Sequence, residues 1–180
     1  MNYYADVILP LPIQGTFTYQ LTIEQSKLLG VGHRVAVSFG KRKIYTGVIK
    51  QIHNQKPDFS KLKPIEFSYD KKALVTELQI EFWSWISKYY FTPIGDVLKA
   101  AIPSTFLLES DTIIIKKEID NEAIEKLTEE EFLIYEALDF KNLKINEVSE
   151  IIDKKSTYSI IQGMIKKNVV ELNFEINEIY

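Results

Sequence analysis

Hydrophobic and polar residues alternate along the first 69 residues in the manner of β-strands. The opening run VILPLP is followed, over residues 16–21, by a stretch in which every second side chain is apolar. A further alternation ends at Phe39, just before Gly40, and the basic residues that follow lead into the stretch IYTGVIKQI. A short strand is expected near residues 64–69. Alternating strands joined by glycine-containing and basic turns predict a small β-barrel or curled sheet with a cationic loop at its rim.

The hydrophobic period becomes helical after residue 75. The apolar positions at this spacing are Leu78, Phe82, Trp85, Ile86 and Tyr89. They predict a helix over residues 77–90 whose aromatic face lies in the core, because such a stripe is far more often core than a stacking platform for bases. Thr76 and Gln79 form a capping box at its start. Thr92 as N-cap and Pro93 at the first helical position predict a second, shorter helix, so a helix pair should pack against the sheet.

The last third of the chain combines helices with short strands. Residues 111–119 predict a strand or an extended connector, and residues from Thr128 onward predict a helix with three acidic residues in its first turn. A second helix should end at Asp153-Lys154-Lys155, a third should begin near residues 156–157, and residues 169–179 alternate like a hairpin or wing. Three helices followed by a strand pair predict a winged-helix domain.

The net charge also differs between the part of the chain before residue 105 and the part after it. Of the 180 residues, 1–105 carry a net charge of +5 and 106–180 carry −8, which together make the overall −3. We therefore predict an α+β protein with two domains, a mainly β domain over 1–105 and a linker with a winged helix over 106–180. The basic first domain is the better candidate for a polyanionic partner such as DNA.

Several classes of function find no support in the composition. The chain has no cysteine, and its two histidines show no metal-ligand spacing, so we expect no metal site and no thiol chemistry. No phosphate-binding glycine loop and no convincing catalytic set can be assembled, so we expect no enzyme activity within these residues. No leader or membrane-spanning run is present, and we expect a cytoplasmic protein without a membrane partner.

The candidate DNA-binding residues lie mostly in the first domain. Phe17 offers a ring for stacking on a base, although a core position on its strand is an equally good interpretation. Gly40 would let the backbone approach a sugar closely, and a glycine that serves only the turn is an equally good interpretation. The basic side chains expected to contact phosphates are Lys41, Arg42, Lys43, Lys61 and Lys63.

In the third helix of the winged helix, the candidates for DNA contact are Thr157, Tyr158, Gln162 and Lys166. Glu171, Glu175 and Glu178 in the wing oppose DNA contact there, and winged helices also serve in protein interaction.

Three stretches of the first domain resemble a known family. VILPLPIQGTFTY, GHRVAVSFGKRKIYTGVI and above all KYYFTPIGDVLKAAIP are similar to the N-terminal region of the PriA family of primosomal replication-restart helicases. The resemblance covers roughly residues 3–105. It implies an OB-like 3′-DNA-binding domain that recognises the 3′ end of the nascent leading strand at a fork. A winged helix follows in that family.

The resemblance also implies a binding pocket for the terminal nucleotide. Its residues fall on Phe17, Thr18, Gly40 and Lys63, and Tyr19 on the same strand is expected to contact the DNA end with them. Thr18 departs from the pattern, because many members carry an aspartate there, and a neutral acceptor forms a hydrogen bond about half as strong. For the longer parent protein the resemblance implies ATP, magnesium and zinc as cofactors, and other primosome proteins and single-stranded DNA-binding protein as partners. None of these cofactors is expected within these 180 residues.

Two other classes of function remain open from the residues alone. The third helix of a winged helix could read duplex DNA, as in a transcription regulator, through Gln162 and Lys166. Alternatively, the acidic second half could dock a basic protein partner.

Overall fold

The computed structural model describes residues 3–40, 43–57, 62–109, 111–152 and 154–173. It divides into two compact units, 1–108 and 109–180, and each is described by itself. The first unit extends three residues beyond the predicted boundary at 105. The reason is that Leu107 and Leu108 are buried in it, and the Leu108 carbonyl oxygen accepts hydrogen bonds from the backbone and the hydroxyl of Thr46.

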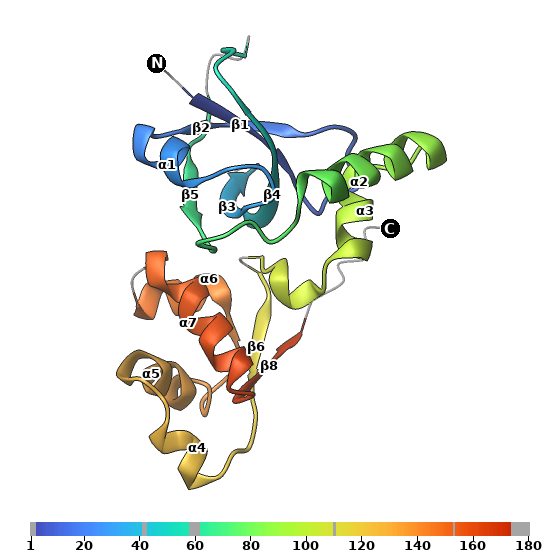
Figure 1. The fold of residues 1–180 in the computed structure, drawn as a ribbon. Helices are drawn as coiled ribbons and strands as arrows, with labels where there is room; N and C mark the ends of the chain where they lie inside the picture. The colour runs from blue at the N-terminus through green and yellow to red at the C-terminus, as the bar shows by residue number, and fades with distance from the viewer. Residues whose placement is uncertain (1–2, 41–42, 58–61, 110, 153, 174–180) are drawn as a thin grey trace. The chain divides into compact units, whose positions relative to one another are not determined.

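Five antiparallel strands form a curled sheet in the first unit (Figure 1). They are β1 (Tyr3–Ile8), β2 (Phe17–Leu21), β3 (Arg34–Phe39), β4 (Lys43–His53) and β5 (Ile65–Ser68), in the order β2-β1-β4-β3-β5. The two ends of this order approach one another where Gln20 of β2 forms a parallel bridge with Pro64, just before β5. The backbone N–H of Gln20 donates a hydrogen bond to the Lys63 carbonyl oxygen at 2.9 Å. The predicted strands and the curled sheet are thus confirmed.

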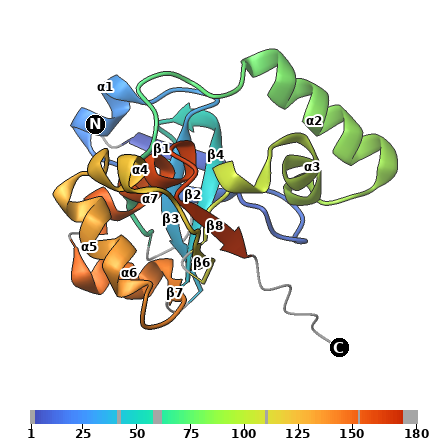
Figure 2. The same cartoon turned by 90° about the horizontal axis from the view of Figure 1, so that it is seen from below.

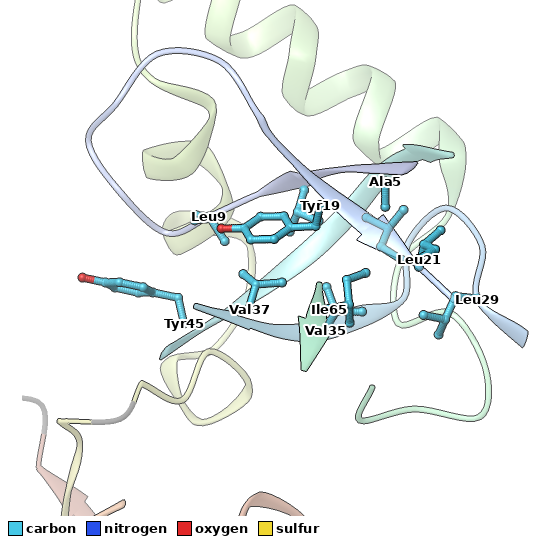
Figure 3. Packing of buried hydrophobic residues seen from close by; sticks show 11 residues of the cluster. Ala5, Leu9, Tyr19, Leu21, Leu29, Val35, Val37, Tyr45 and Ile65 are labelled. Atoms are coloured by element: carbon cyan, nitrogen blue, oxygen red, sulfur yellow. The ribbon is translucent and has the colours of Figure 1, made fainter. Parts of the chain in front are cut away.

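The concave side of the sheet holds the main hydrophobic core of the first unit. Side chains from all five strands and from the segments beside them converge there (Figure 3). The residues labelled in the figure are Ala5, Leu9, Tyr19, Leu21, Leu29, Val35, Val37, Tyr45 and Ile65. Because successive side chains on a strand point to opposite faces, the apolar members of each alternation come together on this side.

The helical segments of the first unit are α1 (Ile23–Leu28), α2 (Glu77–Tyr90), α3 (Ile94–Ala101) and the short 3₁₀ helix η1 (Ser104–Phe106). Of these, α2 and α3 cover the other side of β1 and β4, whereas α1 contacts β2. A second core cluster joins Ile8 and Val48 of the sheet to Trp83 of α2 and Leu98 of α3. The helix over 77–90 and its capping box are confirmed. For α3 the N-cap is Pro93 instead of the predicted Thr92, so this helix begins one residue later than expected.

The predicted buried face of α2 is wrong for four of its five residues, and only Ile86 of the five packs against the second core cluster. Leu78, Phe82, Trp85 and Tyr89 are between 53% and 74% exposed, whereas Ile80 and Trp83 are buried. The exposed rings lie against one another, with Phe82 and Trp85 stacked at 6.0 Å and Trp85 and Tyr89 at 5.1 Å. The helix has two apolar stripes, and the shorter one packs on the sheet. Periodicity alone favoured the longer stripe.

The second unit combines a three-stranded antiparallel sheet with four helices among its described residues. The elements are β6 (Ile113–Lys116), α4 (Asn121–Glu125), α5 (Glu129–Ala137), β7 (Leu143–Lys144), α6 (Ile145–Ile151), α7 (Lys154–Lys166) and β8 (Val170–Asn173). The strand order is β7-β6-β8, and α5, α6 and α7 cluster together (Figure 2). The central strand therefore comes from the segment that precedes the helices.

Two predictions for the second unit need correction. The third helix, α7, begins at Lys154, so Lys154 and Lys155 belong to it and do not close the preceding helix, which ends at Ile151. The expected strand pair over 169–179 is represented by β8, which pairs with β6. The rest of that pair, with Glu175 and Glu178, lies outside the described residues. The predicted strand over 111–119 is confirmed as β6.

Candidate nucleic-acid interface

A closed series of contacts joins three segments at one rim of the curled sheet. The Phe17 ring at the start of β2 meets Phe39 at the end of β3 edge to face, with 4.7 Å between ring centroids. Gly40 follows Phe39 directly, and its carbonyl oxygen accepts a hydrogen bond from Lys63 Nζ at 2.5 Å. The Lys63 carbonyl oxygen in turn accepts from the Gln20 amide of β2. Residues far apart in the sequence are thereby brought together at one rim.

Phe17 is half-buried and packs against the main core of the first unit. It lies on the same face of β2 as Tyr19, whereas Thr18 projects from the opposite face, as strand alternation requires. The interpretation of Phe17 as a core residue is confirmed, and stacking of its ring on a base stays a prediction.

Gly40 occupies a turn and keeps the space beside it open. Its backbone has φ +66°, in the left-handed region that favours glycine, and a Cβ built there would meet no atom of the described residues within 4 Å, its chain neighbours aside. Lys63 is exposed beside it. An ammonium group has three N–H donors, so Lys63 retains donors for a phosphate or sugar oxygen after its bond to Gly40.

The other predicted basic contacts are only partly described. Lys43 is half-buried, and its Nζ lies 5.2 Å from the centroid of the Tyr45 ring. Lys41, Arg42 and Lys61 lie outside the described residues. The basic hairpin over residues 41–43 stays a prediction as a phosphate-binding loop.

Tyr19 belongs to the core instead of the rim. It is 3% exposed, its ring points inward (Figure 3), and its hydroxyl donates to the Ser38 carbonyl oxygen at 3.3 Å. Burial raises its pKa to about 12. We therefore correct the expectation that this ring contacts DNA, because the Tyr19 side chain is buried in the main core and packs beneath β2.

Sequence reasoning missed a polar cluster centred on Asp6 of β1. The Thr18 hydroxyl donates to Asp6 Oδ1 at 2.6 Å, and Gln51 Nε2 of β4 donates to Asp6 Oδ2 at 2.6 Å. His53 Nε2 lies 3.4 Å from Asp6 Oδ1. The only sequence signal was one carboxylate within the otherwise uncharged strand YYADVI. Three neighbouring strands are needed to assemble the cluster, so local pattern could not reveal it.

The carboxylate of Asp6 is held in its charged form. Burial raises the pKa of this carboxyl group. The hydrogen bonds from Thr18, Gln51 and His53, together with the attraction of His53, lower the pKa by more than burial raises it. The net result is a pKa below the usual value of an aspartate. Asp6 is therefore an anion at neutral pH, beside Thr18 at the start of β2.

The predicted DNA-contacting residues of α7 do not form one exposed face. Thr157 and Tyr158 are buried, at 0% and 3% exposure, so the expectation that they reach a DNA groove is corrected. Burial, with the nearby charges of Asp111 and Glu109, raises the pKa of Tyr158. Gln162 is half-buried and Lys166 is exposed. The helix turns its first apolar side chains inward, a direction that residue type alone does not reveal.

No three histidine, cysteine, aspartate or glutamate side chains among the described residues are grouped so as to hold a metal ion. None of the helices in the described ranges combines the length and apolar character required to cross a membrane.

Comparison with known proteins assigns the first unit to a family. The family described as the PriA 3′DNA-binding domain (3′BD) matches residues 6–103. Replication restart protein PriA of Buchnera aphidicola is 28% identical over 179 residues, which cover 95% of this chain and 24% of that protein. PriA of Treponema pallidum is 26% identical over 105 residues, or 56% of this chain and 16% of that protein.

A further relative extends the likeness into the second unit. PriA of Rickettsia prowazekii is 22% identical over 167 residues, which cover 92% of this chain and 23% of that protein. The chain thus spans about a quarter of the length of these relatives. The family match covers more than half of the chain and includes Phe17, Thr18, Gly40 and Lys63. The chain belongs to the PriA 3′-DNA-binding-domain family.

Proposed function

We propose that this chain binds branched DNA during replication restart and that its first unit receives the 3′ end of a DNA strand. The observation that carries the proposal is the closed series of contacts among Phe17, Gly40 and Lys63, within the segment that matches the family. The proposal assigns binding to these 180 residues and no catalytic step.

Each residue at the rim has a physical role in this proposal. The half-buried Phe17 ring would stack on the terminal base, a contact worth about 1–3 kcal/mol. The open space beside Gly40 would admit the terminal sugar. Lys63, fixed by the Gly40 carbonyl oxygen, would bind the last phosphate with a salt-sensitive contact. Lys41, Arg42, Lys43 and Lys61 would extend the phosphate contact along the strand.

The proposal extends to the folds of the two units. The curled five-stranded sheet, closed by the Gln20–Pro64 bridge, supports an OB-like description, and this class of fold binds single strands. Helices α5, α6 and α7 with β7 and β8 support a winged helix in the second unit. In that winged helix Gln162 and Lys166 are the remaining candidates for DNA contact.

The longer protein adds proposals of its own. By its likeness to PriA proteins, this chain would deliver a fork to an ATP-dependent helicase that uses magnesium and zinc. Other primosome proteins and single-stranded DNA-binding protein would be its partners, in the cytoplasm. All of these concern the roughly three quarters of the relatives' length that the chain does not span.

Fluorescence anisotropy with two fork substrates tests the proposal. The forks differ only in whether the leading strand at the junction ends in a 3′-hydroxyl or a 3′-phosphate, and a blunt duplex serves as reference. We expect tightest binding to the free hydroxyl. Phe17→Leu, which keeps an apolar side chain but removes the ring, and Lys63→Ala should each weaken binding to this fork.

Lys27→Ala is the matched control for Lys63→Ala. It removes the same charge from an exposed position on α1 and should leave the preference between the forks unchanged. Equal binding to both forks would contradict recognition of the 3′ end. Equal binding to forks and blunt duplex would contradict the whole proposal and would favour a duplex-reading second unit. Loss of all DNA binding at about 150 mM salt would favour a protein-interaction module.

A further inference from the structure

We propose that Asp6 determines selectivity for a free 3′-hydroxyl by orienting and polarising the Thr18 hydroxyl group. This inference rests on the proposed binding of a DNA 3′ end. It concerns a residue outside the pocket that the sequence predicted, on a different strand from any member of that pocket. Its role is that of a positioning residue, which acts through Thr18.

The hydrogen-bond geometry leaves Thr18 with a single role toward a ligand. A threonine hydroxyl has one proton and two lone pairs. The proton is donated to Asp6 Oδ1 at 2.6 Å, a length typical of a hydroxyl bonded to a carboxylate. Thr18 can therefore only accept a hydrogen bond from a further partner. A terminal 3′-hydroxyl can donate that bond, whereas a 3′-hydrogen cannot, so the arrangement distinguishes the two ends.

Donation to a carboxylate also makes the Thr18 oxygen a better acceptor. Hydrogen bonds in a chain polarise one another, and the negative charge of Asp6 enters the chain through Thr18. Through this bond the charge of Asp6 strengthens the hydrogen bond that the uncharged Thr18 would accept from a ligand. The anion is thus moved one strand away, from the position of Thr18 on β2 to the facing position on β1, since Asp6 and Thr18 are register partners.

The surroundings of Asp6 hold its carboxylate in the necessary orientation. Gln51 Nε2 occupies Oδ2, which leaves Oδ1 for Thr18. The β1–β4 pairing shifts register between Asp6 and Val7, and such an irregularity re-aims a side chain. His53 lies beside the pair, at 3.4 Å from Oδ1, and its buried Nδ1 has no hydrogen-bond partner among the described residues. The side chain of Asp6 is only 15% exposed, so it is shielded while Thr18 remains half-buried.

The position of Thr18 is consistent with contact to a strand end. It follows Phe17 directly and projects from the same face of β2 as the exposed Gln20. The backbone N–H of Gln20 donates a hydrogen bond to the carbonyl oxygen of Lys63. The side chain of Thr18 therefore lies on the strand that carries both the proposed stacking ring and the contact to the proposed phosphate-binding lysine.

Binding of the 180-residue chain to two forks that differ by a single atom tests this inference. The leading strand at the junction ends either in a 3′-hydroxyl or in a 3′-hydrogen from a dideoxynucleotide, and the ratio of the two dissociation constants is the readout. We expect the unaltered chain to prefer the hydroxyl by about tenfold, as for one charge-assisted hydrogen bond. Asp6→Asn and Thr18→Val should each reduce the ratio to about twofold or less. The double variant should reduce it no further, because the two residues act in series.

A rescue variant separates positioning from mere structural support. Asp6→Asn combined with Thr18→Asp places the charge at the facing position on β2 and should return the ratio to about tenfold. Glu24→Gln, which removes one exposed carboxylate from α1, is the charge-matched control and should leave the ratio unchanged. A thermal melt of each variant checks that its fold is intact.

The outcomes distinguish this inference from the function on which it rests. If the unaltered chain binds both ends equally, recognition of the 3′-hydroxyl fails and the role of Asp6 fails with it. If the preference exists but survives Asp6→Asn in a folded variant, only the role of Asp6 is refuted. If Asp6→Asn removes the preference and Thr18→Asp does not restore it, Asp6 supports the strand structurally and does not act through Thr18.

Discussion

A buried ion pair between Arg34 and Asp70 provides a sharp test of what stabilises the first unit. Arg34 is 2% exposed, and its Nε and Nη2 atoms donate to the two carboxylate oxygens of Asp70, each at 2.7 Å. Its Nη1 donates to the Phe106 carbonyl oxygen at 3.0 Å, and its guanidinium lies 4.8 Å from the centroid of the Phe106 ring. Asp70→Ala removes the carboxylate and leaves a buried cation whose remaining acceptor among the described residues is the Phe106 carbonyl oxygen.

The expected cost follows from the burial of the two partners. Removing one member of a buried pair typically costs about 3–5 kcal/mol, because the remaining charge is uncompensated. The side chain of Asp70 is 21% exposed, so water can partly replace it, and we expect a loss near the lower end, about 3 kcal/mol. Replacing both residues by apolar ones, Arg34→Met with Asp70→Ala, should recover most of this loss, since no charge remains buried.

Denaturant unfolding followed by tryptophan fluorescence measures this cost for the first unit alone. Both tryptophans of the chain, Trp83 and Trp85, lie on α2 in that unit. Asp70→Ala should lower the midpoint without changing the slope against denaturant concentration. A loss below about 1 kcal/mol, the range of exposed ion pairs, would refute the reasoning. So would a double variant that is less stable than Asp70→Ala.

Three further predictions follow from burial, backbone geometry and charge. Trp83→Ala should cost about 3–5 kcal/mol in free energy of unfolding and Trp85→Ala less than about 1, measured by circular dichroism, because only Trp83 is buried; similar losses would contradict the observed face of α2. Gly32→Ala should be much more destabilising than Gly40→Ala in the same melts. Both have positive φ, but a Cβ at Gly32 would lie 1.8 Å from a backbone oxygen, and one at Gly40 would meet nothing within 4 Å in the part of the chain that the structure describes. Asp6 has a lowered pKa in the folded state, so its stabilisation is present above the unfolded pKa of about 4 and is lost as pH falls through the folded value. Asp6→Asn should therefore reduce stability at pH 7 and flatten the decline below about pH 4, and an unchanged decline would refute this.

Local signals in the sequence were sufficient for several elements. The capping box at Thr76 and the helix over Glu77–Tyr90 were predictable because both depend on residues a few positions apart. A similar capping box at Thr22 and Gln25 marks α1, which the strand-based interpretation overlooked. The strands of the first unit were predictable from alternation because one or both of their faces are buried.

In the candidate site, too, local motifs identified some residues, whereas their contacts depend on distant parts of the chain. Gly40 and Lys63 were identified through local motifs, yet their hydrogen bond depends on strands that are distant in sequence. Tyr19 was assigned to DNA because its neighbours matched, whereas its burial depends on the whole curled sheet. Asp6 was missed because its partners come from two other strands.

The sequence by itself determined the family, the order of most strands and helices and the presence of two differently charged halves. These features depend on short-range periodicity, on caps and on motifs read along the chain. Only the tertiary structure decided which stripe of α2 is buried, that Tyr19, Thr157 and Tyr158 face inward, and that Asp6 holds the hydroxyl of Thr18. The physical reason is that burial and hydrogen-bond partners depend on which surfaces meet, and those surfaces come from residues far apart in the chain.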